Sequence, residues 1–266
     1  MSNLLSLYVD RSRLEIRALV RDKRSITFSM FLPIFLLLIF GSVFGHQEIG
    51  QSGVKFSQYF VAGMLASGLL YSAFQQLAIM IPEERSNGTL KRLVGSPMPK
   101  SVYFVGKFAC SLFIYVFQAI FLLGIGHLAF GITMPRSASL WFVFVWVSFL
   151  GLVVSTLLGV AFSTLAKDGR AASALATPVV LFFQFTSGVY LIYTQLPRWM
   201  QTIAALFPLK WMAQAMRGVF LPTAFAANEA GGSYEFTKAA AVLGIWTVIG
   251  AVLCAFTFRW LPKDAD

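Results

Sequence analysis

The residue types best suited to polar chemistry gather in one short segment that lies between two long apolar runs. Residues 81–101 read IPEERSNGTLKRLVGSPMPKS and hold two acids, four basic residues, two glycines and three prolines. Glu83 and Glu84 could pair with Arg85 or with basic groups on another protein. The segment therefore predicts docking through ion pairs, although a solvated connecting loop explains the same composition.

Bond-making chemistry has no matching motif in the sequence. The one Gly-Lys pair, Gly106-Lys107, lacks the first glycine and the following Ser or Thr of a phosphate-binding P-loop. The patterns G-x-S-x-G and H-E-x-x-H are absent as well. Cys110 and Cys254 lie in apolar runs without ligand spacing, which predicts packing roles. We therefore expect no catalytic residue, metal site, cofactor or ATPase motif in this chain.

The elements that position the 81–101 segment are predicted to be membrane-spanning helices. Of the 266 residues, 58% are hydrophobic and only 12% are charged, with a mean hydropathy of +0.74. A soluble domain usually carries about a quarter charged residues, and an apolar run of about 20 residues can cross a bilayer. We predict a single all-α membrane domain over residues 1–266, with spans at 26–45, 57–81, 102–130, 140–165, 172–193 and 239–258.

The distribution of basic residues predicts the orientation of these six spans. Fifteen lysines and arginines fall on the side that holds both termini and the 81–101 segment, and six fall on the other side. The positive-inside rule places the richer side, including the tail 259–266, in the cytoplasm. This asymmetry accounts for the net charge of +10 without a nucleic-acid partner.

A helix is predicted before the first span, within residues 1–25. Its basic residues, which include Arg13, Arg17 and Arg21, follow steps of three or four along one face, and apolar residues gather on the other. This pattern is typical of a helix that lies in the interface with its bases toward anionic lipid. An ordinary basic flank of the first span is the alternative.

A second short helix is predicted inside the 81–101 segment. Gly88 ends the preceding helix because glycine tolerates positive φ, and Thr89 can cap a new helix over 90–94. Leu90 and Leu93 share one face of that helix. Because one or two turns are not stable alone, these leucines need the membrane domain or a partner protein to cover them.

Two separate stretches resemble the permease subunits of type-2 ATP-binding-cassette (ABC) exporters, of the daunorubicin-resistance and nodulation-export type. EERSNGTLKRLVGSP (residues 83–97) is similar to the family pattern E-R-E-x-G-T-L-E-x-L-x-x-[ST]-P, with Lys91 where Glu is common. SGVYLIYTQLPRWMQTIAALFPLKWMAQAMRG (residues 187–218) resembles a second family block, with Gln214 near its acidic position.

The resemblance implies a division of labour between chains. In this family the cytoplasmic loop and the N-terminal helix dock on a separate ATPase subunit, which binds ATP and Mg. The implied assembly has two ATPase copies and a second permease or a paralogue, in a prokaryotic cell membrane. The coupling residues would be Glu83, Glu84, Arg85, Gly88, Thr89, Leu90 and Leu93.

The resemblance also implies an external gate in residues 194–236, built from short re-entrant helices ahead of the last span, 237–258. The residue pattern agrees, because prolines interrupt an amphipathic run that is too broken to cross the bilayer. The gate residues would be Gly188, Pro197, Pro208 and Arg217.

The cargo is only weakly constrained by the sequence. Polar residues within the spans are sparse, and they either join helices by hydrogen bonds or face a translocation path. The residues considered for the path are Gln75, Gln76, Gln118 and Gln184. The many aromatic residues favour an apolar or amphiphilic small molecule, with polysaccharide or glycolipid as the alternative. A secondary transporter is a weaker prediction because ionisable residues are missing from the interiors of the predicted spans. A membrane assembly protein is a second, equally weak alternative.

Overall fold

The computed structural model describes residues 4–21, 23–50, 52–258 and 260, with residues 23–32 described by their backbone only. Within these ranges the chain is helical and has no strand beyond an isolated bridge between Glu48 and Lys55. The long helices are α2 (Lys23–Phe44), α3 (Phe56–Leu69), α6 (Lys100–Phe130), α7 (Ala138–Phe162), α8 (Gly169–Thr186) and α11 (Phe236–Thr257).

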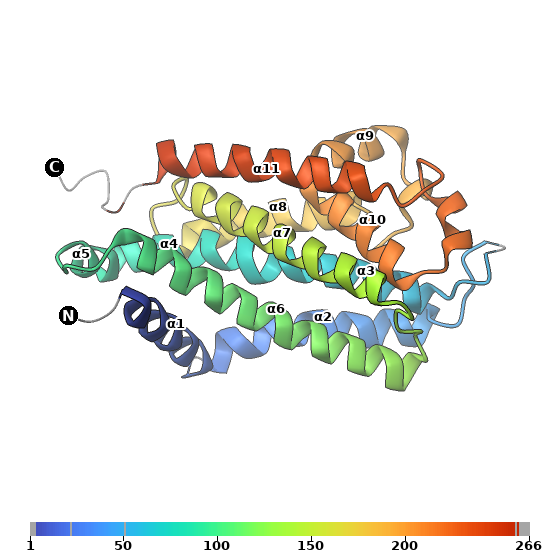
Figure 1. The fold of residues 1–266 in the computed structure, drawn as a ribbon, viewed down its shortest axis with the longest axis horizontal. Coiled ribbons are helices and arrows are strands. Elements are labelled where there is room, and N and C mark those ends of the chain that lie inside the picture. The colour runs from blue at the N-terminus through green and yellow to red at the C-terminus, as the bar shows by residue number, and fades with distance from the viewer. Residues whose placement is uncertain (1–3, 22, 51, 259, 261–266) are drawn as a thin grey trace.

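The long helices run side by side along the longest axis of the molecule (Figure 1). Helix α1 (Leu4–Arg21) and the short helix α5 (Thr89–Val94) lie at one end, where α11 also finishes. At the opposite end lie α9 (Arg198–Leu206) and α10 (Pro208–Phe220), joined to α8 by the turn Tyr193–Gln195 and to α11 by the turn Thr223–Asn228. The predicted cytoplasmic and external elements therefore separate to the two ends of the bundle.

Four continuous helical stretches of the described chain are long and apolar enough to cross a bilayer. They are Phe56–Ser86, Lys100–Phe130, Ala138–Phe162 and Phe236–Thr257. The first predicted span falls in α2, of which only Pro33–Phe44 could be searched for apolar character. The fifth falls in α8, which has 18 residues and ends at Thr186, earlier than the predicted 193. The prediction of a multi-pass, all-helical membrane protein is confirmed, and the count of six spans stays a prediction.

The second predicted span contains a wider turn that the sequence did not predict. After α3 the chain forms a π-helical segment over Leu70–Gln75 and then continues as α4 (Gln76–Ser86). Helix α7 approaches this segment closely at Gly159, where an added Cβ would lie 2.7 Å from the carbonyl oxygen of Phe74. A side chain at position 159 would therefore push the two helices apart.

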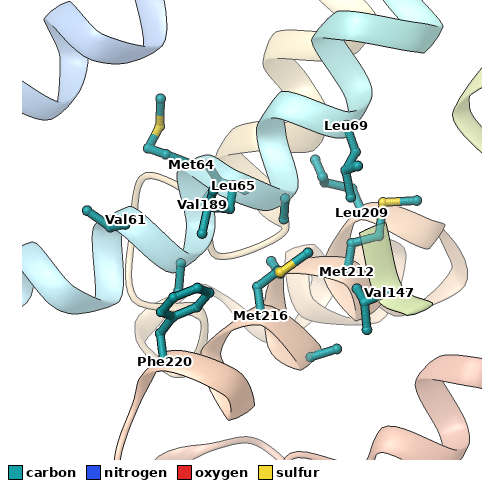
Figure 2. Close-up of a cluster of buried hydrophobic side chains, with 14 of the residues drawn as sticks. Val61, Met64, Leu65, Leu69, Val147, Val189, Leu209, Met212, Met216 and Phe220 are labelled. Carbon is teal, nitrogen blue, oxygen red and sulfur yellow. The ribbon is translucent and has the colours of Figure 1, made fainter. Parts of the chain in front are cut away.

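The core of the bundle lies between α3 and α10. Nearly every residue of α3 is buried, and its Leu65 and Leu69 lie on the side of α10 that carries Met212 and Met216 (Figure 2). Gly151 of α7 completes the contact, since an added Cβ there would lie 2.7 Å from Leu69. This packing holds α10 inside the bundle although it is too short to cross a membrane.

Helices α9 and α10 form a hairpin that turns beside the middle of α11. The indole nitrogen of Trp246, halfway along α11, donates a hydrogen bond of 2.8 Å to the carbonyl oxygen of Leu206. At the turn, the ring of Phe207 lies 4.3 Å from that of Phe183 and 5.6 Å from that of Trp246, between centroids. Pro208 begins α10, where its missing N–H costs no helical hydrogen bond.

Candidate functional site

The predicted short helix is present as α5, and its start differs in detail from the prediction. Gly88 has φ of 78°, as predicted, and is the N-cap residue directly before α5. The oxygen that caps the first turn belongs to Asn87, whose side chain accepts a 3.0 Å hydrogen bond from the backbone N–H of Thr89. Thr89 is the first helical residue and does not act as the cap.

The apolar face of α5 packs against the chain's own helices. Leu90 is fully buried in a cluster with Leu77 and Ile81 of α4 and Tyr103 of α6, while Leu93 is half-buried at the edge of that cluster. The surface left exposed on α5 is Lys91, Arg92 and Val94. The membrane domain itself therefore covers the first leucine, and a basic surface with one apolar residue faces outward.

A buried ionic cluster centres on Lys107 and is connected to the Leu90 cluster through Tyr103. This lysine is 1% exposed, forms an ion pair with Glu84 at the end of α4, and reaches Glu15 of α1 at 2.8 Å. The hydroxyl of Tyr103 donates to the second oxygen of Glu84 at 2.7 Å, and Arg11 pairs with Glu15. Two carboxylates and two cations thus balance in a site where an unpaired charge would be costly.

Helix α1 is held against α6 by the same residues. An added Cβ at Gly106 would lie 2.9 Å from the Cγ of Arg11 and 3.3 Å from the Cγ of Glu15, so this glycine lets the two helices approach. One turn earlier, the hydroxyls of Tyr8 and Ser101 lie 2.8 Å apart. Helix α1 is thereby joined to the end of α4 through Lys107. Its exposed basic residues are Arg13, Arg17 and Arg21.

The remaining charged residues of the 81–101 segment point in different directions. Arg85 is buried and donates to the carbonyl oxygen of Ser163 at 3.2 Å, and within the described chain it pairs with neither glutamate. Glu83 is exposed and lines an open hollow of about 360 Å³ together with Asp168 and Arg170. Of the two predicted glutamates, only Glu84 enters the ionic cluster.

At the opposite end, the predicted gate residues Gly188 and Arg217 meet. Arg217 is fully buried and binds Glu229 with two nitrogens, one of them at 2.9 Å. It also donates to the carbonyl oxygen of Gly188 at 3.2 Å and lies 4.9 Å from the ring centroid of Tyr59. Gly188 has φ of 75°. The other two predicted gate residues lie at helix starts: Pro197 directly precedes α9, and Pro208 is the first residue of α10.

The four predicted path glutamines do not form one group. Gln184 and Gln75 join α8 to the α3–α4 helix, through a 2.9 Å bond to Ser67 and a 3.3 Å bond to Thr177. Gln76 contacts Cys110 at 3.9 Å, and the amide of Gln118 has no hydrogen-bond partner among the described residues. Hydrogen bonding between helices therefore describes Gln75 and Gln184 well, and a role in a path stays a prediction for all four.

The sequence prediction assigns no site role to four of these charged residues. Glu15 and Lys107 belong to the ionic cluster, Glu229 pairs with Arg217, and Lys210 is buried at the start of α10. Lys107 and Lys210 each lie in an apolar stretch, where a cation signals a partner or a function. That signal marks the lysines, but it does not say which carboxylate, if any, each one meets.

Comparison with known proteins identifies relatives. A model of the ABC-2 type transporter family matches residues 10–221. The chain is 27% identical over 153 residues to YbhR of Escherichia coli, named as a probable multidrug ABC transporter permease, which covers 55% of this chain and 39% of that protein. It is also 23% identical over 198 residues to the transport permease YvfS of Bacillus subtilis, covering 73% and 77% of the two chains.

Proposed function

Because this chain belongs to the ABC-2 type transporter family and is a multi-pass membrane permease, we propose that ATP hydrolysed by partner subunits drives export through it. The functional unit has two permeases and two ATPase subunits. Six spans cross a prokaryotic cell membrane, and both termini, α1 and α5 are cytoplasmic. The charge asymmetry of the sequence supports this orientation.

The ionic cluster at Lys107 is the observation that carries the proposed coupling. It joins α1, the end of α4 and α6 through Glu15 and Glu84, while α5 stands on the same helices through Leu90. A displacement of α5 by the ATPase is therefore transmitted to α4 and α6 directly, through packed side chains. The basic surface of Lys91 and Arg92 suits an acidic groove on the ATPase.

We propose an apolar or amphiphilic small molecule as the cargo. The long helices expose rows of large apolar side chains, among them Phe117 and Phe121 of α6 and Phe182 and Phe185 of α8. Such faces are in contact with lipid or with a second permease, and an amphiphile can approach along them. The name of the E. coli relative, a multidrug permease, supports the same class.

The test is reconstitution of the permease with its ATPase in nanodiscs and in liposomes. We expect the ATPase to co-purify with the permease, hydrolysis to rise with an apolar drug, and drug movement to require ATP. Permease that purifies alone from cells expressing both subunits, or drug movement that continues with a hydrolysis-deficient ATPase, would contradict the proposal.

A further inference from the structure

Helix α11 is followed by two aromatic side chains that the proposed coupling does not use. The helix finishes at Thr257, at the end of the bundle that also holds α5 (Figure 1), and Phe258 and Trp260 come after it. Both side chains are half-buried, whereas the neighbouring Phe256 is 86% exposed. The ring centroids of Phe258 and Trp260 lie 5.1 Å apart. The two rings therefore form one aromatic unit that is turned toward the bundle.

This aromatic pair packs on the first turns of α6. The ring centroid of Phe258 lies 5.0 Å from that of Phe104. The ring of Trp260 lies 5.5 Å from that of Tyr103 and 5.8 Å from that of Phe104. These pairs meet edge to face, which is an arrangement that aromatic quadrupoles favour. The ammonium of Lys100, the first residue of α6, lies 5.7 Å from the Trp260 centroid and adds a cation–π contact.

Tyr103 connects the aromatic pair to α5 and to the ionic cluster. It is fully buried, and it shares a cluster with Leu90 of α5, at whose edge the aromatic pair lies. Its hydroxyl donates at 2.7 Å to Glu84 at the end of α4. A displacement of α5 that moves Tyr103 therefore also moves the surface on which the end of α11 rests.

The other half of α11 holds the hairpin of α9 and α10. Trp246 donates to the carbonyl oxygen of Leu206 at 2.8 Å, and its ring lies 5.6 Å from that of Phe207. Sharp helix kinks arise mostly at proline or where the hydrogen-bond ladder is interrupted. Helix α11 is continuous over 22 residues and contains no proline. A displacement of its end is therefore carried along the helix to the hairpin.

We propose that Phe258 and Trp260 are positioning residues that couple a displacement of α5 to the α9–α10 hairpin through α11. The aromatic pair holds the end of α11 on α6, so α11 follows when the ATPase moves α5. The hairpin then follows at Trp246. This inference rests on the proposed function, since it assigns the route by which the ATPase acts on the predicted external gate.

The test uses the complex of permease and ATPase in nanodiscs. Energetic coupling is established by the response of one site to a change at another, so the hairpin carries the reporter. A bimane fluorophore is attached to the cysteine of Trp199→Cys, because Trp199 lies on α9 and is 54% exposed. The native Cys110 and Cys254 are removed. The bimane spectrum is recorded with and without a non-hydrolysable ATP analogue, and drug-stimulated hydrolysis is measured in parallel.

We expect the ATP analogue to shift the bimane spectrum of the otherwise unchanged complex. Trp260→Ala and Phe258→Ala should each lose most of this shift and lower drug-stimulated hydrolysis severalfold. Co-purification of the ATPase and basal hydrolysis should be kept, because the exposed face of α5 is intact. Trp260→Phe should restore most of the shift, since it keeps an aromatic ring on α6.

Two variants serve as matched controls. Phe256→Ala removes an exposed ring from the same end of α11 and should leave the bimane shift unchanged. Trp141→Ala removes an edge-to-face pair with Phe144 at the start of α7. It shows how far a loss of aromatic packing, read as a lower melting temperature, affects the shift by itself. We expect Trp141→Ala to lower the melting temperature as Trp260→Ala does and to keep the shift.

The outcomes separate this inference from the proposed function. A full bimane shift in both Trp260→Ala and Phe258→Ala, or an equal loss in either control, would overturn the inference. Loss of ATPase co-purification in these two variants would also count against it, since the rings would then serve docking. An otherwise unchanged complex that couples drug to hydrolysis without a bimane shift overturns the inference alone. Failure of that complex to couple drug to hydrolysis overturns the proposed function as well.

Discussion

Lys107 of α6 joins α1 and α4 because a buried ammonium group needs carboxylate partners to offset its charge. Removing one partner of a buried pair leaves the other charge without compensation, which typically costs about 3–5 kcal/mol, whereas exposed pairs contribute about 0–1 kcal/mol. Lys107 and Glu15 are both buried and Glu84 is half-buried. The pair Glu235–Lys238, with its exposed lysine, is a natural comparison within the same chain.

We predict that Lys107→Met lowers the thermal stability of the permease strongly, because Glu84 then loses its cation and only Arg11, which pairs with Glu15, is left to balance two carboxylates. Lys238→Met should lower it little. The measurement is the melting temperature by fluorescence size-exclusion chromatography. Adding Glu84→Gln to Lys107→Met should restore part of the loss, and a single variant as stable as wild type would remove the cluster from the account of the fold.

Two glycines border α5 and differ in backbone conformation. Gly88 has φ of 78° and Gly95 has φ of −75°. Neither has a neighbour that would clash with an added Cβ, since nothing lies within 4 Å at Gly88 and the nearest atom at Gly95 is 3.7 Å away. Any difference between the same substitution at the two sites therefore reports on φ, which a β-branched residue resists above zero.

We predict that Gly88→Val leaves the permease inserted and expressed but lowers substrate-stimulated ATP hydrolysis severalfold. Gly95→Val should have a much smaller effect, because its φ is open to every residue. Co-purification of the ATPase and hydrolysis in nanodiscs are the two readouts. Equal activity of the two variants would mean that the bend at Gly88 transmits no force.

At the scale of the element, α5 combines an anchored face with an open one. Leu90 is held by α4 and α6, whereas Leu93 is half-buried and Val94 is 45% exposed. A helix of 6 residues has no stability of its own, so the anchored face keeps it helical. The open face is left for a partner.

We predict that Leu93→Asp reduces co-purification of the ATPase severalfold while expression of the permease is kept. Leu90→Asp should instead lower expression or melting temperature, because it buries a charge in the cluster with Ile81 and Tyr103. Comparing the two variants separates docking from folding. The interpretation fails if Leu93→Asp binds the ATPase normally.

At the scale of the whole molecule, the two ends of the bundle carry different chemistry. The end with α1 and α5 holds the ionic cluster at Lys107, and the other end holds Arg217 and the α9–α10 hairpin (Figure 1). The positive-inside rule assigns the first end to the cytoplasm. The orientation can be tested without knowledge of the cargo.

We predict that cysteines introduced at Ser137 and Ala230 react with an impermeant thiol reagent added outside intact cells, and that cysteines at Asn87 and Asp168 do not. All four positions are exposed, so accessibility alone does not decide the result. The background should lack the native Cys110 and Cys254. Labelling of position 87 from outside would reverse the orientation and remove α5 from any contact with an ATPase.

We further predict that native mass spectrometry of the purified complex shows two permease and two ATPase copies. Apolar rows on α6, α8 and α11 stay exposed in one chain, and a second permease can cover one of them to enclose a route. An active complex with a single permease would contradict this arrangement.

The sequence alone determined the properties that depend on neighbouring residues. Long apolar runs predict helices because backbone groups in lipid must be satisfied within the segment. Gly88 marks the positive-φ bend, and Leu90 marks the buried face of α5, since both follow from local conformation and spacing. Pro208 is predicted to interrupt an apolar run, and the structure places it at the start of α10. Residues 1–3 and all of the predicted tail 259–266 except Trp260 lie outside the described residues.

Only the tertiary structure decided which helices meet and at which residues. Lys107 and Glu15 are 92 positions apart and come together because Gly106 lets α1 approach α6. The π-helical turn beside Gly159, and the depth at which the hairpin places Lys210, likewise depend on packing between helices. A helix that is apolar on all sides can face its neighbours in many orientations about its own axis. The fit of side chains between helices selects one rotation, and with it the partners of each buried charge.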